Sequence, residues 1–414
     1  MDKKYILGRR DANEKSSLNI GRYYALDGSL GAPVYLDVSK PHVIFLCGKR
    51  GYGKSYTIGV FLEEFCSLDE EIRRNISFIV ADTLGIFWTS IFPNKREVEN
   101  LKRWGIEASG IEIEIFTSPE LASYYRKFGI KANEISISAS ALKTFHWCRL
   151  FGISPQSMEG IAISRATGEM EGKYGIEDIM ENIKNDKEIS KETKMACINF
   201  FVMAKNLKIF AKDGINLSDI AKRGKISIID LSPYDESIKE VILSILGEII
   251  FYERIIERKK DEEREMGIEK FEQSLPFIWL AIDEAHIFLP KEDKITKDVF
   301  VKRWLRQGRQ PGLSLILAAQ RVGSMDSEVL AHADIIICHR LTSQEDIEAM
   351  SNVRPTYMRE SIGEVIKKMG SEKGVALIVD DVTEVSHLVK IRPRKSWHGG
   401  GEPAYINHQA GEYE

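Results

Sequence analysis

The stretch Gly48–Ser55 limits what this chain can fold into more than any other. It reads Gly-Lys-Arg-Gly-Tyr-Gly-Lys-Ser, which fits the pattern G-x-x-x-x-G-K-[ST], and it directly follows the apolar run Val43–Cys47. A buried strand that runs into a glycine-rich turn and then a helix forms a cradle for phosphate, because glycine lets successive backbone N–H groups point inward. The following helix directs its positive dipole end at the same place. The stretch therefore predicts a site for a nucleoside triphosphate.

The residue types in this stretch indicate ATP and Mg²⁺ as the expected ligands. Lys54 is expected to neutralise the β- and γ-phosphates, and the hydroxyl of Ser55 is expected to hold Mg²⁺. The residues expected to surround the nucleotide are Gly48, Lys49, Arg50, Gly51, Tyr52, Gly53, Lys54, Ser55 and Tyr56.

The composition favours a globular chain with a sizeable core. The chain has 414 residues, 43% of them hydrophobic and 29% charged, and its five cysteines are scattered without C-x-x-C spacing. No apolar run reaches the ~18 residues of a membrane span and the N-terminus lacks a long apolar segment, so we expect a cytoplasmic protein without membrane contact. The net charge of −4 argues against a surface coated with basic residues, yet it is compatible with a local basic channel.

Apolar runs of strand length alternate with helical segments through most of the chain. This alternation predicts an α/β fold with a mostly parallel sheet that is covered on both faces. The main expected strands are 43–47, 76–81, 225–230, 277–282, 313–319 and 335–338.

Between residues 140 and 222 the apolar residues recur with helical spacing instead, which predicts an all-α insertion. We therefore expect a core formed by 41–139 and 223–392 and interrupted by this helical insertion. A short β-rich segment, 1–40, is expected before the core, and a C-terminal tail, 393–414, after it.

Two adjacent carboxylates follow one of the expected strands. The run Phe277–Ile282 is apolar and leads directly into Asp283 and Glu284. Asp283 is expected to reach the Mg²⁺ held by Ser55, and Glu284 is expected to polarise a water for attack on the γ-phosphate. The alternative, a strand end capped by two solvated acids, is less consistent with a phosphate loop in the same chain.

Further polar residues lie near the neighbouring strand. Gln320 follows Leu313–Ala319, at the carboxyl end where ligand sites collect in open α/β sheets, and it is expected to sense the γ-phosphate unless it is a simple turn residue. Arg303, Arg306 and Arg309 are spaced three residues apart, which places them on one face of a helix. They are either arginine fingers for a neighbouring subunit's nucleotide or a solvated helix face.

Several motifs occur in an order that resembles a known family. They are Gly48–Thr57, Asp82-x-x-Gly85, Ile229–Ser232, Ile282–His286, Arg306–Arg321 and Arg392–Gly400. Together they resemble the HerA branch of the HerA/FtsK superfamily of DNA-pumping ATPases. The resemblance implies a RecA-like P-loop NTPase core that assembles as a hexameric ring, threads double-stranded DNA and works with a nuclease of the NurA kind. It also implies that residues 303–309 face the adjacent subunit's ATP and that His398 and Gly399 lie near the nucleotide.

The sequence departs from the pattern of that family in three places. The 47 residues before Gly48 are fewer than the family's N-terminal barrel needs, so we expect the barrel to be reduced or absent. In the family this barrel helps to form the ring and to dock the nuclease, so the choice of partner is left open. Ile86 stands where an acid is usual, and Val322 stands where a proline is usual. Neither position contacts phosphate, Mg²⁺ or water in the expected site, so we expect hydrolysis to be retained.

Two classes of function are compatible with these features. The first is an ATP-hydrolysing ring that translocates double-stranded DNA, acting with a nuclease or another effector in DNA processing or defence. The second is an ATP-dependent oligomeric scaffold that presents an effector protein. A motor for conjugation or viral DNA packaging is close to the first in sequence and differs chiefly in its partners. Stimulation of hydrolysis by DNA distinguishes the pump from the scaffold.

Overall fold

The computed structural model describes residues 5–10, 14–25, 27–168, 170–214, 217–268, 275–353, 357–358 and 361–401. Parts of the expected N-terminal segment (1–4, 11–13 and 26) and of the expected tail (402–414) lie outside the described residues. The strands are β1 (Tyr5–Leu7), β2 (Ser17–Tyr24), β3 (Leu30–Asp37), β4 (Val43–Cys47), β5 (Ile76–Asp82), β6 (Glu114–Thr117), β7 (Lys131–Glu134), β8 (Ile137–Ser138), β9 (Phe210–Ala211), β10 (Ile226–Asp230), β11 (Phe277–Ile282), β12 (Leu313–Ala319), β13 (Ile335–His339), β14 (Val375–Asp380) and β15 (Val385–Ile391).

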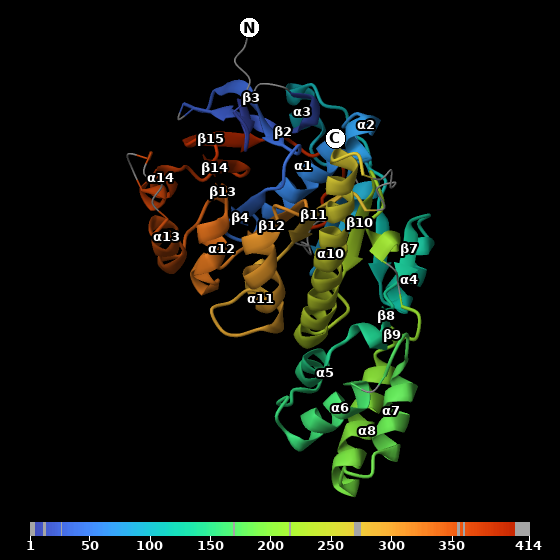
Figure 1. Cartoon of the computed structure of the whole chain (residues 1–414). Coiled ribbons are helices and arrows are strands. Elements are labelled where there is room, and N and C mark those ends of the chain that lie inside the picture. The colour runs from blue at the N-terminus through green and yellow to red at the C-terminus, as the bar shows by residue number, and fades with distance from the viewer. Residues whose placement is uncertain are drawn as a thin grey trace, which may run out of the picture.

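The α-helices connect these strands and cover the sheet (Figure 1). They are α1 (Lys54–Cys66), α2 (Glu70–Arg73), α3 (Val98–Trp104), α4 (Pro119–Arg126), α5 (Thr144–Phe151), α6 (Met158–Gly168), α7 (Ile176–Asn185), α8 (Lys191–Asn206), α9 (Leu217–Ile220), α10 (Glu236–Glu265), α11 (Ile295–Val299), α12 (Ser327–His332), α13 (Gln344–Ser351) and α14 (Ile362–Lys368). A π-helical turn, Phe300–Leu305, follows α11. Within the described ranges, no helix combines the length and the apolarity needed to span a bilayer.

Among the described residues, one 13-stranded sheet runs in the order β1-β3-β2-β15-β14-β13-β4-β12-β11-β5-β10-β6-β7. Every neighbouring pair from β13 to β7 is parallel. This confirms the predicted α/β fold with a mostly parallel sheet. On the other side of β13, the strands β14, β15, β2 and β3 pair antiparallel in turn. Strand β15 thereby joins the C-terminal part of the chain to the N-terminal segment.

The parallel strands are apolar on both faces because each face has its own helical cover. Along β4, Phe45 belongs to the core cluster that contains Leu243 of α10. Its neighbours Ile44 and Leu46 belong to the cluster that contains Phe61 of α1. Since successive side chains of a strand point to opposite faces, α10 covers one face and α1 the other. This explains why the strands read as continuous apolar runs.

Helices α5 to α8 lie together below the sheet in Figure 1, and α10 connects them to the core. Val241 and Ile245 of α10 pack into the apolar cluster of these helices. On the same helix the buried carboxylate of Glu248 contacts Lys143, just before α5, and accepts a hydrogen bond from Arg303 at 3.1 Å. The helix α10 therefore joins the helical region to the arginine-bearing segment by both apolar and charged contacts.

A charge network, buried except for Arg309, lies at the amino ends of the parallel strands. His42, which precedes β4, forms hydrogen bonds with Asp334 at 3.0 Å and with Asp37 at 3.2 Å. Arg9 pairs with Asp37 at 3.1 Å, and Arg309 pairs with Asp334 at 3.0 Å. Burial by itself lowers the pKa of His42, but the hydrogen bonds to the two acids outweigh burial and raise the pKa to about 9.

This network predicts that the protein loses stability as the pH rises from about 6.5 to about 9. The pKa of His42 lies above its ordinary value of 6.5, so the stabilising charge is fully present below pH 6.5 and is lost as the pH passes about 9. His42→Asn should lower the free energy of unfolding on the order of 2 kcal/mol more at pH 6 than at pH 9.5. Urea denaturation at both pH values measures this, with His332→Asn on α12 as the control. If wild type and His42→Asn lost the same amount of stability between pH 6 and pH 9.5, the prediction would be contradicted.

Candidate active site

The phosphate loop joins β4 to α1 at the carboxyl edge of the parallel strands. Gly51 and Gly53 have φ angles of 79° and 124°, which glycine adopts at little cost and other residues do not. These angles curl the backbone into a concave turn before α1 begins. The first N–H groups of a helix have no partner within the helix, so those of α1 are available to an anion at this turn.

The side chain of Lys54 folds back onto the phosphate loop. Its side chain is buried, and Nζ donates a hydrogen bond to the backbone oxygen of Gly48 at 2.9 Å. Burial lowers the pKa of Lys54, whereas the negative charges of Glu284 and Asp283 oppose this shift. An ammonium group with one carbonyl partner and two carboxylates nearby is well placed to bind phosphate oxygens.

Ser55 and Asp283, for which the sequence predicts a shared Mg²⁺, lie in contact with each other. The Ser55 hydroxyl donates a hydrogen bond to Oδ2 of Asp283 at 2.9 Å. Asp283 is fully buried, and burial together with the charge of Glu284 raises its pKa to about 6. A buried carboxylate without a cation is costly, so these two oxygens fit a hard divalent ion such as Mg²⁺.

Within the described ranges, no group of three or more His, Cys, Asp or Glu side chains is placed to hold a metal ion. Mg²⁺ at Ser55 and Asp283 would therefore take its remaining oxygen ligands from phosphate and water. This division is usual for Mg²⁺ in nucleotide sites.

Glu284 adopts a left-handed backbone conformation beside the phosphate loop. Its φ and ψ are 52° and 42°, which are uncommon for a residue with a side chain and cluster at functional sites. The side chain is buried: Oε1 contacts the amide of Gln320, and Oε2 has no hydrogen-bond partner among the described residues. His286 Nδ1 lies 3.3 Å from Oε2. A carboxylate oxygen at this place, with an imidazole beside it, fits the predicted role of holding a water.

Gln320 reaches Glu284 because their strands are neighbours. Strands β11 and β12 pair in parallel, so the residues that follow them emerge at the same edge of the sheet. The structure therefore brings together Lys54, Ser55, Asp283, Glu284 and Gln320 at the carboxyl edge.

The three arginines diverge, contrary to the expectation that they share one face. Arg303 donates to Glu248 on α10, Arg306 donates to Glu328 on α12, and Arg309 donates to Asp334. The π-helical turn that contains Arg303 interrupts regular α-helical spacing, so residues three apart no longer align.

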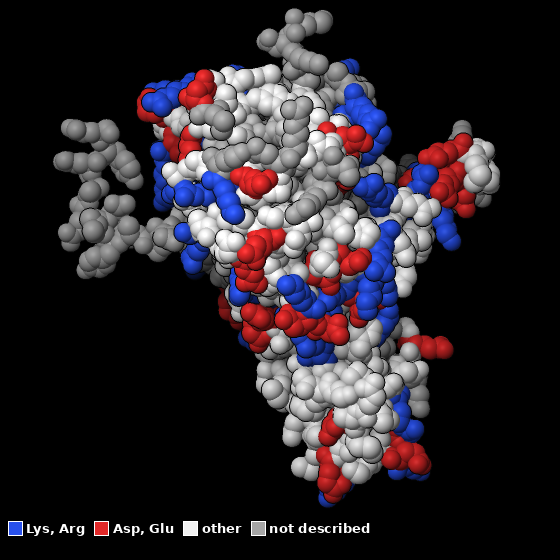
Figure 2. Space-filling model, turned by 90° about the vertical axis from the view of Figure 1, so that its left-hand side faces the viewer, with Lys and Arg blue, Asp and Glu red and all other residues white. Residues whose placement is uncertain are grey.

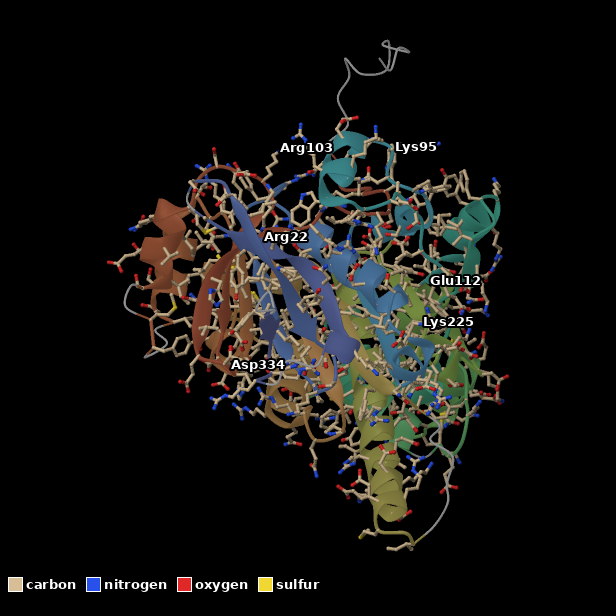
Figure 3. All side chains as sticks on the ribbon, turned by 90° about the horizontal axis from the view of Figure 1, so that it is seen from above. Arg22, Lys95, Arg103, Glu112, Lys225 and Asp334 are labelled. Carbon is tan, nitrogen blue, oxygen red and sulfur yellow. The ribbon has the colours of Figure 1, made fainter. Side chains whose placement is uncertain are left out.

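Arg309 lies at the opposite edge of the sheet from the phosphate loop of its own chain. Its partner Asp334, labelled in Figure 3, precedes β13, whereas the loop follows β4, which runs parallel to β13. A strand of five residues separates the two edges by about 16 Å. Arg309 is therefore too far away to contact a nucleotide on its own loop.

The C-terminal residues predicted near the nucleotide lie beside the first turn of α1. The ring of His398 packs edge-on against Tyr56, with ring centroids 5.4 Å apart. A Cβ added to Gly399 would lie 2.7 Å from the backbone oxygen of Ile86, so the chain passes closely there. Burial and the charges of Arg394 and Arg96 lower the pKa of His398 to about 3.

Two buried features, one at the end of β13 and one on α1, were not predicted. His339 ends β13 and contacts the phosphate loop, and Glu63 of α1 binds Arg392 and Arg394. The place of His339 at the carboxyl end of an expected strand was a usable signal. No local pattern identified the partner of Glu63, because the arginines lie more than 300 residues further along the chain.

Comparison with known proteins gives a family. The family model of the central domain of helicase HerA matches residues 18–250. The match includes the phosphate loop and ends before Asp283 and Glu284.

Individual relatives are distant. A DNA double-strand break repair helicase HerA from Pyrococcus furiosus is 26% identical over 200 residues, which cover 44% of this chain and 36% of that protein. A probable helicase from Methanocaldococcus jannaschii is 24% identical over 368 residues, 84% of this chain and 66% of that protein. The alignment with the HerA of Saccharolobus solfataricus covers 35% of that protein. The alignments thus span about a third of the length of these HerA proteins.

Solved structures share the fold. VirB4 of Thermoanaerobacter pseudethanolicus superposes with a TM-score of 0.57 at 13% identity, covering 96% of this chain and 99% of that chain. The plasmid coupling protein TrwB, in complex with a non-hydrolysable GTP analogue, superposes with a TM-score of 0.52 at 10% identity, covering 88% of each chain. At these identities the likeness concerns the fold alone.

Proposed function

The chain belongs to the helicase HerA central-domain family of P-loop ATPases, and on that premise we propose that it hydrolyses ATP to translocate double-stranded DNA. The observation that carries this proposal is the convergence of a phosphate-loop lysine, a Ser55–Asp283 pair and the buried Glu284 at one edge of the sheet. Among the described residues, Oε2 of Glu284 has no hydrogen-bond partner. Each of these groups has a defined task in phosphoryl transfer to water.

In the proposed reaction, Lys54 and the N–H groups of the loop bind the β- and γ-phosphates. Ser55 and Asp283 would hold Mg²⁺, which would supply positive charge to neutralise the phosphates. Oε2 of Glu284, which has no hydrogen-bond partner among the described residues, accepts a hydrogen bond from the attacking water. It takes up the proton of this water as the new bond to the γ-phosphorus forms and the bond from that phosphorus to the oxygen of ADP breaks, so that ADP is the leaving group. The amide of Gln320 contacts the other oxygen of Glu284, Oε1. Gln320 therefore couples the γ-phosphate region to β12, the strand that ends just before Gln320.

We further propose that the subunits form a hexameric ring in which Arg306 and Arg309 reach the ATP of a neighbour. Their side chains are 52% and 62% exposed, and Arg309 lies too far from its own loop to act there. A ring uses a head-to-tail interface, in which opposite faces of the subunits meet. Such an interface can bring the amino edge of one sheet near the carboxyl edge of the next.

The proposed partner is double-stranded DNA, together with a nuclease of the NurA kind or another effector. Figure 2 shows acidic and basic side chains interspersed across the middle of one face, without a large patch of one sign. Six subunits around one duplex combine many weak phosphate contacts, so no single subunit needs a strongly basic face. DNA binding of this kind is expected to weaken steeply as salt rises.

The test is the rate of ATP hydrolysis by the purified protein with and without linear double-stranded DNA, at low and at high salt. We expect DNA to raise the rate at low salt, and high salt to remove this increase. Glu284→Gln should show neither basal nor stimulated hydrolysis, which excludes a contaminating ATPase. A rate that is lost in Glu284→Gln but indifferent to DNA at every salt concentration would sink the translocase proposal and favour an ATP-dependent scaffold.

A further inference from the structure

His339 lies directly behind the phosphate loop. It is the last residue of β13, and the preceding residue of that strand, Cys338, is paired in register with Cys47 of β4. Its side chain is fully buried. The carboxyl ends of these two parallel strands thus place an imidazole ring where the loop leaves β4.

His339 lies against both ends of the loop, with its Cβ at Gly48 and its ring at Gly53. A Cβ added to Gly48 would lie 2.6 Å from the Cβ of His339, and a Cβ added to Gly53 would lie 3.0 Å from its Cε1. The first distance is too short for any side chain, and the second requires the neighbour to give way. The backbone of the loop therefore rests on His339 at the glycine where it begins and at the glycine where it ends.

Hydrogen bonds extend this contact into α1. Nδ1 of His339 lies 3.2 Å from the backbone oxygen of Val375, and Nε2 lies 3.0 Å from Oγ1 of Thr57. A carbonyl oxygen can only accept, so Nδ1 carries the proton in the neutral ring and Nε2 is the acceptor. The hydroxyl of Thr57 has a single proton, which it shares between Nε2 and the backbone oxygen of Gly53, 2.9 Å from Oγ1. Thr57 is thus held between the imidazole and the last glycine of the loop.

The ring is neutral in this setting. Burial lowers the pKa of His339 to about 4, and the nearby charge of Lys54 acts in the same direction. A neutral ring can accept from Thr57 through Nε2, which an imidazolium cannot. His339 therefore holds the loop through packing and hydrogen bonds and adds no charge of its own to the phosphate site.

We propose that His339 is a positioning residue that fixes the curvature of the phosphate loop and thereby sets its affinity for nucleotide. The inference rests on the proposed function in that the loop must bind a nucleoside phosphate. His339 contacts Gly48, Gly53 and Thr57, whereas the water-activating Glu284 contacts Gln320. Its effect should fall on binding of ADP and ATP alike and leave the chemical step unchanged, because loop N–H groups bind the phosphates before and during reaction.

The experiment measures the dissociation constant for Mg·ADP by calorimetry, together with KM and kcat for ATP. His339→Ala should raise the dissociation constant and KM about tenfold, the loss expected when one buried hydrogen bond is removed, and should change kcat less than about twofold. Thr57→Val, which keeps the shape of Thr57 but removes its hydroxyl, should produce a similar rise. His339→Gln, whose amide can reach Thr57, should recover more affinity than His339→Asn, whose amide replaces only the bond to Val375.

A matched control separates positioning from a loss of folding. His146→Ala removes an equally buried histidine from α5, and it should leave the dissociation constant unchanged. If His339→Ala and Thr57→Val bind Mg·ADP as tightly as wild type, or if kcat falls while binding is unchanged, the positioning role is overturned. If wild type itself binds no Mg·ADP, the proposed function fails instead, and the two failures are thereby distinguished.

Discussion

Glu284→Gln is expected to lower the rate of ATP hydrolysis by about two to four orders of magnitude while ATP continues to bind. The amide has nearly the shape of the carboxylate but cannot take a proton from water. Contact with Gln320 can persist because one amide can donate to another. Lys54 and Ser55 are untouched by the change, so the groups that bind phosphate and Mg²⁺ stay in place.

Single-turnover hydrolysis and nucleotide binding should be measured on the same preparations. Lys54→Ala provides the contrast, since it should lose binding as well as hydrolysis. Glu292→Gln, which changes an exposed glutamate shortly after the site, is the control and should behave as wild type. Hydrolysis by Glu284→Gln within tenfold of wild type would show that Glu284 is not the general base.

The acid pair could be predicted from the sequence because its position follows from strand geometry. Asp283 and Glu284 come directly after an apolar strand, and parallel strands end at a common edge with the phosphate loop. The same argument predicts Gln320 at this edge, and in the structure its amide contacts Glu284. The mostly parallel sheet could be predicted equally well from the sequence, because apolar runs separated by helical segments form β4, β5, β10 and β11.

The antiparallel side of the sheet could not be predicted from the sequence in the same way. Val375–Asp380 is an apolar run, but local periodicity does not say which strand it will join. In the structure, β15 pairs with β2, so Val389 lies opposite Tyr23 although the two are far apart in the chain. Such long-range pairing depends on the whole fold, and it is what carries the tail back to α1.

The arginines illustrate a second limit. Their spacing predicted a shared face, which holds for a regular α-helix. The π-helical turn Phe300–Leu305 breaks this regularity, and Arg303, Arg306 and Arg309 turn to three different acids. A change of helical type has no signal as clear as a proline or a glycine, so it is found only in the structure.

Glu63→Ala is expected to destabilise the protein by about 3–5 kcal/mol, the usual cost of breaking a buried ion pair from one side. Glu63 is buried in α1 and accepts hydrogen bonds from Arg392 at 2.9 Å, Arg394 at 3.3 Å and the hydroxyl of Ser396 at 2.6 Å. The backbone N–H of Lys395 donates to the same carboxylate at 2.9 Å. Removing it leaves two buried guanidinium groups without their shared partner.

The pH dependence of this contact has a definite sign. Burial raises the pKa of Glu63, but the charges of Arg394 and Arg392 outweigh burial and hold the pKa below its ordinary value of 4.5. The stabilisation is therefore present above pH 4.5 and is lost as the pH falls through the lowered pKa. Wild type should lose this contribution on acidification, whereas Glu63→Ala has none to lose.

Urea denaturation should compare Glu63→Ala with Glu71→Ala, an exposed position on α2 that should stay within about 0.5 kcal/mol of wild type. The double variant Glu63→Met with Arg394→Met should recover part of the loss, because it removes a charge from each side of the pair. If the double variant recovers stability, the loss in Glu63→Ala comes from leaving Arg394 unpaired. If the double variant loses as much stability as the two single substitutions together, the loss comes from packing instead. A loss below 1 kcal/mol in Glu63→Ala would mean that the tail does not fix α1. Since His398 packs on Tyr56 in the first turn of that helix, a loosened tail should also weaken Mg·ADP binding.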